Sequence, residues 1–318
     1  MRKNEANVYI CPESLKKLTL KVSEESGDEV ITGKLISENG NEYPIVKGVA
    51  NLTTEQLVPG TDAVAQKWYD ENADIYDEYL PLTFMTFSED EVKVRNGMVD
   101  DLHLKSDSVV LEIGAGTGRD SELIAQRLDK NAKFYVQDIS PGMLEKSFDR
   151  LKKFDVPIEY SVFNACYLPF PDNTFDAVYH FGGLNTFSDI KRSFEEINRV
   201  TKVGGRVVIG DESMPYWLRE SKFGRVLMNS NALYKCELPL NDLAISSRDV
   251  RLRWIIGSVF YVFDYTVGEG EPQAVLDFEI PGIRGGTHLT RYEGKLEGVT
   301  QEAVELARQA RDKTGKSM

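Results

Sequence analysis

The sequence predicts an α/β fold in which a parallel sheet carries helices on both faces, with a small β-rich domain before it. Short apolar runs suited to buried strands alternate with helical segments between residues 109 and 210. A glycine-rich turn follows the first of these runs, and polar residues end the later ones. Since ligands of such sheets bind at the carboxyl ends of the strands, we expect the functional site there.

Composition limits the classes of protein that the chain can represent. Its 318 residues are 41% hydrophobic, enough for a full core, and the three cysteines are widely spread, as in a reducing compartment. There is no apolar run near 18 residues and no secretory signal at the start, so we expect a cytoplasmic protein without a membrane partner. The net charge of -13 repels phosphate backbones and disfavours a nucleic-acid partner. The oligomeric state is not predicted.

Residues 1–56 form the predicted β-rich domain, with short alternating strands and a turn at residues 39–41. The text Tyr-Pro-Ile-x-x-Gly from residue 43 and Cys-Pro at residue 11 resemble a zinc-ribbon domain. The four ligand positions of that pattern are held here by Cys11, Ser14, Ile36 and Asn39. A structural zinc site takes four ligands, so we expect no metal. An unrelated β-hairpin cap is the alternative.

Residues 57–100 are predicted to be helical and to form a lid. Aromatic and apolar residues lie close to an i, i+4 pattern from Val64 to Leu80. Tyr76 is the best candidate for a lid residue that closes over a ligand, and core packing is the alternative role for these aromatics.

The predicted core, residues 101–268, begins with the buried strand 109–113 and the turn Gly114-Ala115-Gly116-Thr117-Gly118. The sixth position of a dinucleotide fingerprint is Arg119 rather than glycine, which disfavours NAD, and no Gly-Lys-Ser/Thr follows that would make a Walker A loop. Asp138 comes twenty residues after Gly118 at the end of the next strand, where a carboxylate can accept hydrogen bonds from both hydroxyls of a ribose. The ligand is therefore expected to be a nucleoside.

The later part of the core continues the alternation. Ser140 and Pro141 are an N-cap and first-turn pair, and strands are predicted at residues 158–162, 175–180 and 206–210. A helical insertion is expected near residues 214–248, and residues 250–264 with Gly257 near their middle read as an antiparallel hairpin. Residues 269–318 are expected to form an extension that ends in a helix over 300–313.

Four motifs in this order carry a resemblance: Glu-x-Gly-x-Gly-x-Gly from residue 112, Asp-Ile-Ser-Pro-x-Met-Leu from 138, Leu-Pro-Phe-Pro-Asp-Asn-x-Phe-Asp from 168 and Val-x-Lys-x-Gly-Gly-Arg from 200. With them, residues 66–211 resemble the class I S-adenosylmethionine-dependent methyltransferases, most of all the small-molecule branch of ubiquinone and menaquinone biosynthesis. The resemblance implies a Rossmann-like, seven-stranded sheet, S-adenosylmethionine as cofactor and methyl transfer to O, N, S or C of a small molecule.

The site residues follow from the motifs and from their places at strand ends. Gly114 and Gly116 let the backbone approach the amino-acid portion of the cofactor, Glu112 can pair with its ammonium group, and the Asn164 amide can meet the adenine edge. The residues assigned to the cofactor are Tyr76, Glu112, Gly114, Ala115, Gly116, Asp138, Ile139, Met143, Asn164, Ala165 and Phe181.

A general base is sought among the histidines. His180 ends the fourth core strand and leads into the loop expected to face the substrate. His288 lies in a glycine-bearing loop with Arg284 and Arg291, which could together clamp a carboxylate or phosphate of the substrate or pair with the acidic surface of the protein. Both histidines are retained as catalytic candidates.

Other functions stay open at this point. An RNA or protein methyltransferase is the first, because related ribbons accompany rRNA modification, although the acidic charge opposes RNA. An arsenite methyltransferase would need a set of thiols that the spread cysteines do not match. A scaffold that binds the cofactor without catalysis is the third, since fold analogy does not establish turnover.

Overall fold

The computed structural model describes residues 1–281, 286–293, 305–306 and 308–309. Two compact units divide the chain, residues 1–270 and residues 271–318. The first unit holds the central sheet and the helices that pack on it. The second contributes one short described helix, α9 (His288–Tyr292).

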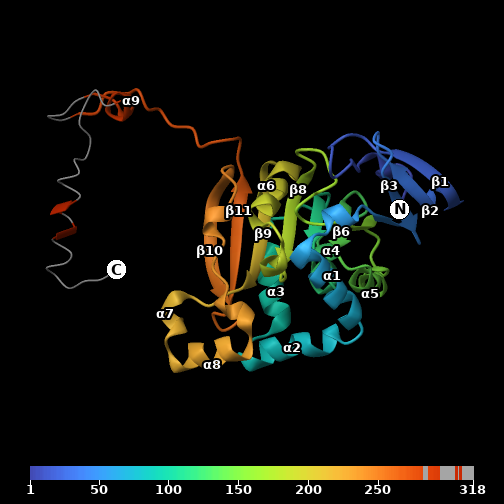
Figure 1. The fold of residues 1–318 in the computed structure, drawn as a ribbon, viewed down its shortest axis with the longest axis horizontal. Helices are drawn as coiled ribbons and strands as arrows, with labels where there is room; N and C mark the ends of the chain where they lie inside the picture. The colour runs from blue at the N-terminus through green and yellow to red at the C-terminus, as the bar shows by residue number, and fades with distance from the viewer. Residues whose placement is uncertain (282–285, 294–304, 307, 310–318) are drawn as a thin grey trace. The chain divides into compact units, whose positions relative to one another are not determined.

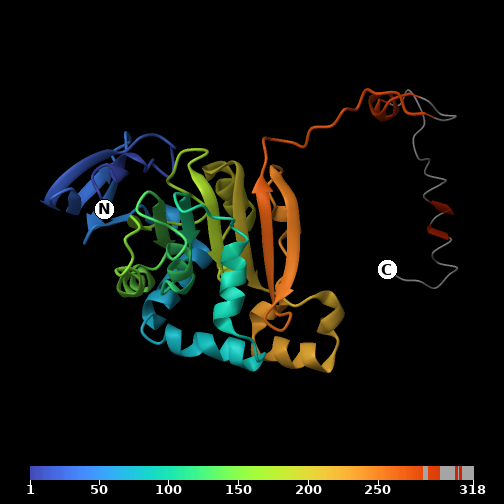
Figure 2. The ribbon, with the colours of Figure 1, turned by 180° about the vertical axis from the view of Figure 1, so that it is seen from behind.

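The central sheet has eleven strands in the order β1-β2-β3-β4-β7-β6-β5-β8-β9-β11-β10 (Figures 1 and 2). Their bounds are β1 (Thr19–Ser26), β2 (Glu29–Ile36), β3 (Glu42–Val46), β4 (Val49–Asn51), β5 (Val109–Ile113), β6 (Lys133–Asp138), β7 (Ile158–Val162), β8 (Phe175–Phe181), β9 (Thr201–Glu212), β10 (Ser247–Ile255) and β11 (Phe260–Val267). Strands β4 to β9 pair in parallel, whereas β11 pairs antiparallel with both β9 and β10. The predicted parallel α/β sheet and its antiparallel hairpin are confirmed.

Helices cover both faces of the sheet. They are α1 (Gly60–Asn72), α2 (Tyr76–Thr86), α3 (Glu91–Asp100), α4 (Arg119–Ala125), α5 (Pro141–Leu151), α6 (Ile190–Val200), α7 (Tyr216–Arg219) and α8 (Lys222–Ser230). Alternate residues of β5 face two apolar cores: Val110 packs in the core that α3, α4 and α5 share, and Leu111 packs in the core of α6. This alternation makes β5 a strand buried on both sides, as in doubly wound α/β sheets.

Local chemistry explains where the helices begin. The Ser140 hydroxyl accepts a hydrogen bond from Met143 N (3.1 Å) and Pro141 fills the first turn of α5, as predicted. Asp189 caps α6 in the same way through Arg192 N (2.9 Å). The helical insertion predicted near residues 214–248 contains α7 and α8, and a 3-10 turn follows the end of α8 at Ser230.

The sheet has four more strands than the seven expected. The N-terminal strands β1 to β4 extend it because β4 pairs in parallel with β7, with Ala50 opposite Ser161 and Asn51 opposite Val162. Within this segment the Cys11 thiol is buried and lies 3.5 Å from the Tyr43 hydroxyl. The described part of the chain contains no group of three or more His, Cys, Asp or Glu side chains placed to hold a metal ion.

Helices α2 and α8 lie across one end of the sheet, at the bottom of both views in Figures 1 and 2. The parallel strands end on this side. Residues 57–100, expected to be helical and to form a lid, contain α1, α2 and α3, and α1 and α2 are called the lid helices. Among the described helices, none is long and apolar enough to cross a membrane. The helix predicted over residues 300–313 lies largely outside the described residues.

Candidate active site

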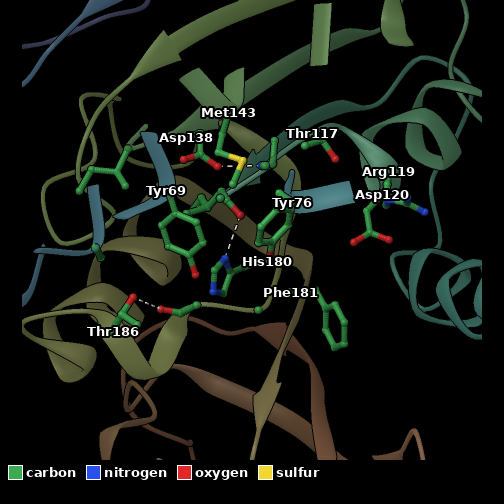
Figure 3. Close-up of a pocket in the computed structure, with 18 of the residues that line it drawn as sticks. Tyr69, Tyr76, Thr117, Arg119, Asp120, Asp138, Met143, His180, Phe181 and Thr186 are labelled. Carbon is green, nitrogen blue, oxygen red and sulfur yellow. Dashed lines mark hydrogen bonds between the residues drawn. The ribbon is translucent and has the colours of Figure 1, made fainter. Parts of the chain in front are cut away.

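A pocket opens at the carboxyl ends of β5, β6, β8 and β9, beneath α1 and α2. Apart from Glu112 and His288, every residue that the sequence assigned to the site lines this pocket. Figure 3 shows Tyr69, Tyr76, Asp138, Met143 and His180 around this cavity. The strand-end argument therefore locates the pocket correctly.

The glycine turn after β5 forms one wall. Gly114 and Gly116 adopt φ values of 65° and 55°, a left-handed conformation that side chains disfavour. Gly114 N donates to Gln137 Oε1 (3.0 Å), and a Cβ atom added at Gly114 would lie 3.2 Å from the His180 ring. The turn thus needs glycine both for its backbone conformation and for the space beside His180.

Asp138, at the end of β6, ties the turn to the next strand. Its Oδ2 accepts from Gly116 N (2.7 Å) and its Oδ1 accepts from Ser140 N (2.8 Å). Burial raises the pKa of Asp138 to about 6, against the opposing effect of these backbone hydrogen bonds. Each carboxylate oxygen keeps a second lone pair that can accept from a ligand hydroxyl.

The Asn164 amide is hydrogen-bonded to residues of the segment 57–100. Its Nδ2 donates to Leu57 O (2.8 Å) and to Asp62 Oδ2 (2.7 Å), and its Oδ1 accepts from Cys166 N (2.8 Å). Both donors of the amide are therefore used within the protein. Asp62, from the first turn of α1, is itself buried and lines the pocket.

Glu112 lies inside the sheet and behind the pocket wall. Its side chain is buried, and no described residue pairs with its Oε2 atom. Burial and the nearby Asp120 carboxylate raise the pKa of Glu112 well above its usual range.

His180 is the penultimate residue of β8, and its ring is buried. Its Nδ1 lies 2.8 Å from the carbonyl oxygen of Ile113, which can only accept, so Nδ1 carries the proton. Nε2 is then a lone-pair acceptor, and within the described residues it has no hydrogen-bond partner. Burial lowers the pKa of His180, which keeps the imidazole neutral near pH 7.

Aromatic side chains and one carboxylate also line the pocket. Phe84, Phe181 and Phe260 line it together with Tyr69, whose ring centroid is 6.0 Å from that of Tyr76. Burial raises the pKa of both tyrosines, which keeps the two hydroxyls protonated.

Glu212 also lines the pocket, and burial together with Asp211 raises its pKa well above the usual range. Asp211 is satisfied by backbone N–H groups of Gly183 (3.2 Å), Asn185 (2.5 Å) and Glu212 (2.8 Å). Asp211 therefore fixes the loop after β8, while Glu212 lines the pocket beside it.

The lid is held to the site by carboxylates. Asp77 of α2 accepts from Thr117 Oγ1 (2.6 Å), Arg119 Nε (3.0 Å) and Arg150 Nη2 (2.8 Å). Asp70 of α1 accepts from the N-terminal residues of α5. Each lid helix is thus hydrogen-bonded directly to the elements that form the pocket.

Sequence reasoning missed five charged residues of the pocket wall: Asp62, Arg95, Arg119, Asp120 and Glu212. The end of β9 was a usable signal for Glu212, because polar residues at strand ends gather at this edge. Arg95 gave no such signal, since an arginine four residues after Glu91 is typical of an exposed helix pair.

His288 begins α9 in the second unit, and its ring centroid lies 6.0 Å from that of Phe278. Of its predicted partners, Arg284 and the side chain of Arg291 lie outside the described residues. The pocket described above is formed by the first unit, from Asp62 to Phe260.

Known proteins are similar to the part of the chain that forms the pocket. Residues 111–209 match the family model described as a methyltransferase domain. The demethylmenaquinone methyltransferase of Symbiobacterium thermophilum is 34% identical over 45% of this chain and 56% of its own length. The ubiquinone/menaquinone biosynthesis C-methyltransferase UbiE of Haemophilus ducreyi is 32% identical over 53% of this chain and 62% of its own. The match thus spans little more than half of each relative.

Among solved structures, phosphoethanolamine N-methyltransferase 2 of Haemonchus contortus, in complex with S-adenosyl-L-methionine, superposes with a TM-score of 0.52. The identity is 16%, and the match covers 72% of this chain and 62% of that one. This likeness concerns the fold. Residues 111–209 are thus similar to a methyltransferase domain, and the fold is a Rossmann-like α/β sheet.

Proposed function

We propose that this chain transfers a methyl group from S-adenosylmethionine to a small-molecule acceptor. One observation carries the proposal: the glycine turn, Asp138 and a neutral imidazole, whose Nε2 has no partner among the described residues, meet in one pocket. The first two suit a nucleoside with an amino-acid tail, and the third suits removal of a proton. When bound, S-adenosylmethionine supplies an electrophilic methyl group.

The cofactor side of the pocket is assigned by contact chemistry. Asp138 would accept hydrogen bonds from the ribose, Gly114, Ala115 and Gly116 would face the amino-acid portion, and Ile139 and Met143 would pack on the adenine. Ala165 lines the same end, where the engaged amide of Asn164 positions α1. Glu112 does not line the pocket; it is a buried carboxyl group behind the wall that the glycine turn forms.

The acceptor side begins at His180. Its Nε2 would take the proton of an O–H, N–H, S–H or activated C–H group, while the Ile113 carbonyl holds the ring in the required tautomer. Tyr76 and Phe181 would enclose the reacting groups and exclude water. His288 remains a second candidate, from the extension.

The aromatic lining of the pocket favours a small aromatic acceptor. Phe84, Phe181 and Phe260 supply rings on which such an acceptor could pack. The two relatives reported above are named for quinone biosynthesis, so quinols head the panel of acceptors. The net charge of -13 makes a nucleic acid a poor alternative.

We also infer that residues 1–56 are a metal-free relative of a zinc ribbon. Of the four ligand positions, Cys11 alone is a cysteine, and its thiol is buried beside Tyr43. The strands of this segment instead gain stability from pairing with the core sheet through β4.

Calorimetric titration with S-adenosylmethionine and S-adenosylhomocysteine tests the proposal, followed by a methyl-release screen over quinols, catechols, thiols and amines. We expect micromolar binding of both nucleosides and turnover with a member of the panel. Binding without turnover on any acceptor would favour the scaffold, and binding of neither would overturn the assignment of Asp138 and the glycine turn.

A further inference from the structure

Arg95 is a buried cation in the pocket wall that neither the motifs nor the comparisons assign. It reaches the pocket from α3, and only 6% of its surface is exposed. Its Nε donates to Glu91 Oε1 (2.8 Å) and its Nη1 donates to Asp120 Oδ2 (2.7 Å). A guanidinium group carries five N–H donors. The other three have no acceptor among the residues that the structure describes.

An unpaired acceptor lies in the same corner of the pocket. Asp120 Oδ1 is buried and, in the described part of the chain, has no hydrogen-bond partner. Buried polar groups are rarely left without partners. A carboxylate would satisfy the free donors, and an ammonium group would satisfy the free acceptor. An α-amino acid carries both groups on neighbouring atoms.

Arg119, the neighbouring arginine of the wall, is already engaged. Its Nε and Nη2 donate to Asp77 Oδ1 (3.0 Å) and to Asp77 O (3.3 Å), and its Nη1 donates to Glu91 (3.0 Å). Arg95 has fewer partners and a fixed position, because its guanidinium carbon lies 5.3 Å from the ring centroid of Phe84 and 5.8 Å from that of Phe181. A guanidinium group held in this way is prepared for a carboxylate ligand.

The place of Asp120 indicates which carboxylate is bound. It is the second residue of α4, directly after the glycine turn that would face the amino-acid portion of the cofactor. Resting on the proposed function, we propose that Arg95 binds the carboxylate of that amino-acid portion, with Asp120 as its positioning residue. The site would thereby select the complete aminocarboxypropyl group over shortened nucleosides.

The test compares two ligands by calorimetry: S-adenosylhomocysteine and its decarboxylated analogue, which keeps the amine. The wild-type protein should prefer the complete ligand by roughly tenfold to a hundredfold, as for a hydrogen bond to a charged group. In Arg95→Gln the affinity for S-adenosylhomocysteine should fall by that factor while the affinity for the analogue stays unchanged. Arg127→Gln is the matched control, since Arg127 pairs with Asp100 of α3 (2.6 Å) away from the pocket.

Arg95→Lys provides a second variant if Arg95→Gln does not fold, because it keeps the charge beside Asp120 and loses the planar fork. It should lose part of the preference for the complete ligand. An unchanged preference in either folded variant, or an equal loss for both ligands, would overturn the inference, as would wild-type affinities that do not differ. If Arg95 instead binds a carboxylate of the methyl acceptor, the preference for S-adenosylhomocysteine over its analogue would be unchanged in the variants. The proposed function itself fails separately, if the wild-type protein binds neither nucleoside.

Discussion

His180 Nδ1 lies 2.8 Å from the backbone carbonyl oxygen of Ile113, and this single contact fixes the tautomer of the imidazole. The two residues face each other across the β5–β8 ladder, in which Ile113 pairs with His180. The proton therefore stays on Nδ1, and the lone pair of Nε2 lies at the carboxyl end of the sheet. The ladder that forms the core thus also orients the proposed base.

Replacing His180 with alanine should lower turnover roughly a hundredfold to ten-thousandfold, the contribution typical of general base catalysis. Affinity for S-adenosylhomocysteine should remain within a few fold, because the ribose assignment rests on Asp138. Single-turnover methyl transfer and calorimetry on the same preparation give both quantities. His103→Asn is the control, since His103 is exposed and does not line the pocket. Unchanged turnover in His180→Ala would leave His180 with a structural role.

The pH dependence of turnover follows from the burial of His180. Burial lowers its pKa below the usual value near 6.5, and a base works in its neutral form. Activity should thus be constant above that pKa and fall as the pH drops through it. A plot of log kcat against pH checks this. If kcat already falls above pH 7 as the pH is lowered, the assignment is contradicted.

The ionisation of Asp138 should make the binding of S-adenosylhomocysteine depend on pH. Its pKa is raised to about 6 by burial, and the ionised form accepts hydrogen bonds from a ribose. Affinity for S-adenosylhomocysteine should be full above about pH 6 and should fall by about tenfold per pH unit below it. Asp138→Asn should bind roughly a hundredfold more weakly, with no such dependence on pH. Calorimetry at several pH values measures both, and a variant that binds like wild type would refute the ribose contact.

The sequence located the pocket because strand ends leave a local signature. Asp138 and His180 each follow an apolar run, and parallel strands bring their carboxyl ends to one edge. Arg95 could not be found this way. Its partner Asp120 is 25 residues away, on a different helix, so the pair exists only once α3 packs on α4.

The strand count failed for a similar reason. The joining strand β4 has three residues, Val49–Asn51, and its partner β7 begins more than a hundred residues later. Parallel pairing between distant short strands leaves no periodic pattern in either segment. The N-terminal strands were therefore recognised as strands, but their place in the main sheet was not.

Asp77→Asn should loosen the lid. The carboxylate of Asp77 joins α2 to Thr117, Arg119 and Arg150, and although burial opposes them, these contacts lower its pKa. Because the side chain is partly exposed, we expect a loss of about 1 kcal/mol and a several-fold faster release of S-adenosylhomocysteine. Stopped-flow displacement measures the release rate. Glu78→Gln is the control, since Glu78 lies beside Asp77 on α2 and is exposed; equal rates in the two variants would show that Asp77 does not hold the lid.

Gly114→Ala separates backbone strain from damage to the site. A left-handed alanine costs about 1–2 kcal/mol, and at Gly114 its Cβ would also press on His180 at 3.2 Å. Gly40→Ala is matched, because Gly40 has a φ of 86° and nothing within 4 Å of an added Cβ. Both variants should lose a similar free energy of unfolding in urea, whereas turnover should fall in Gly114→Ala alone. Turnover that is equal in both variants would mean that the imidazole tolerates displacement, which is incompatible with a base held in place by the Ile113 carbonyl.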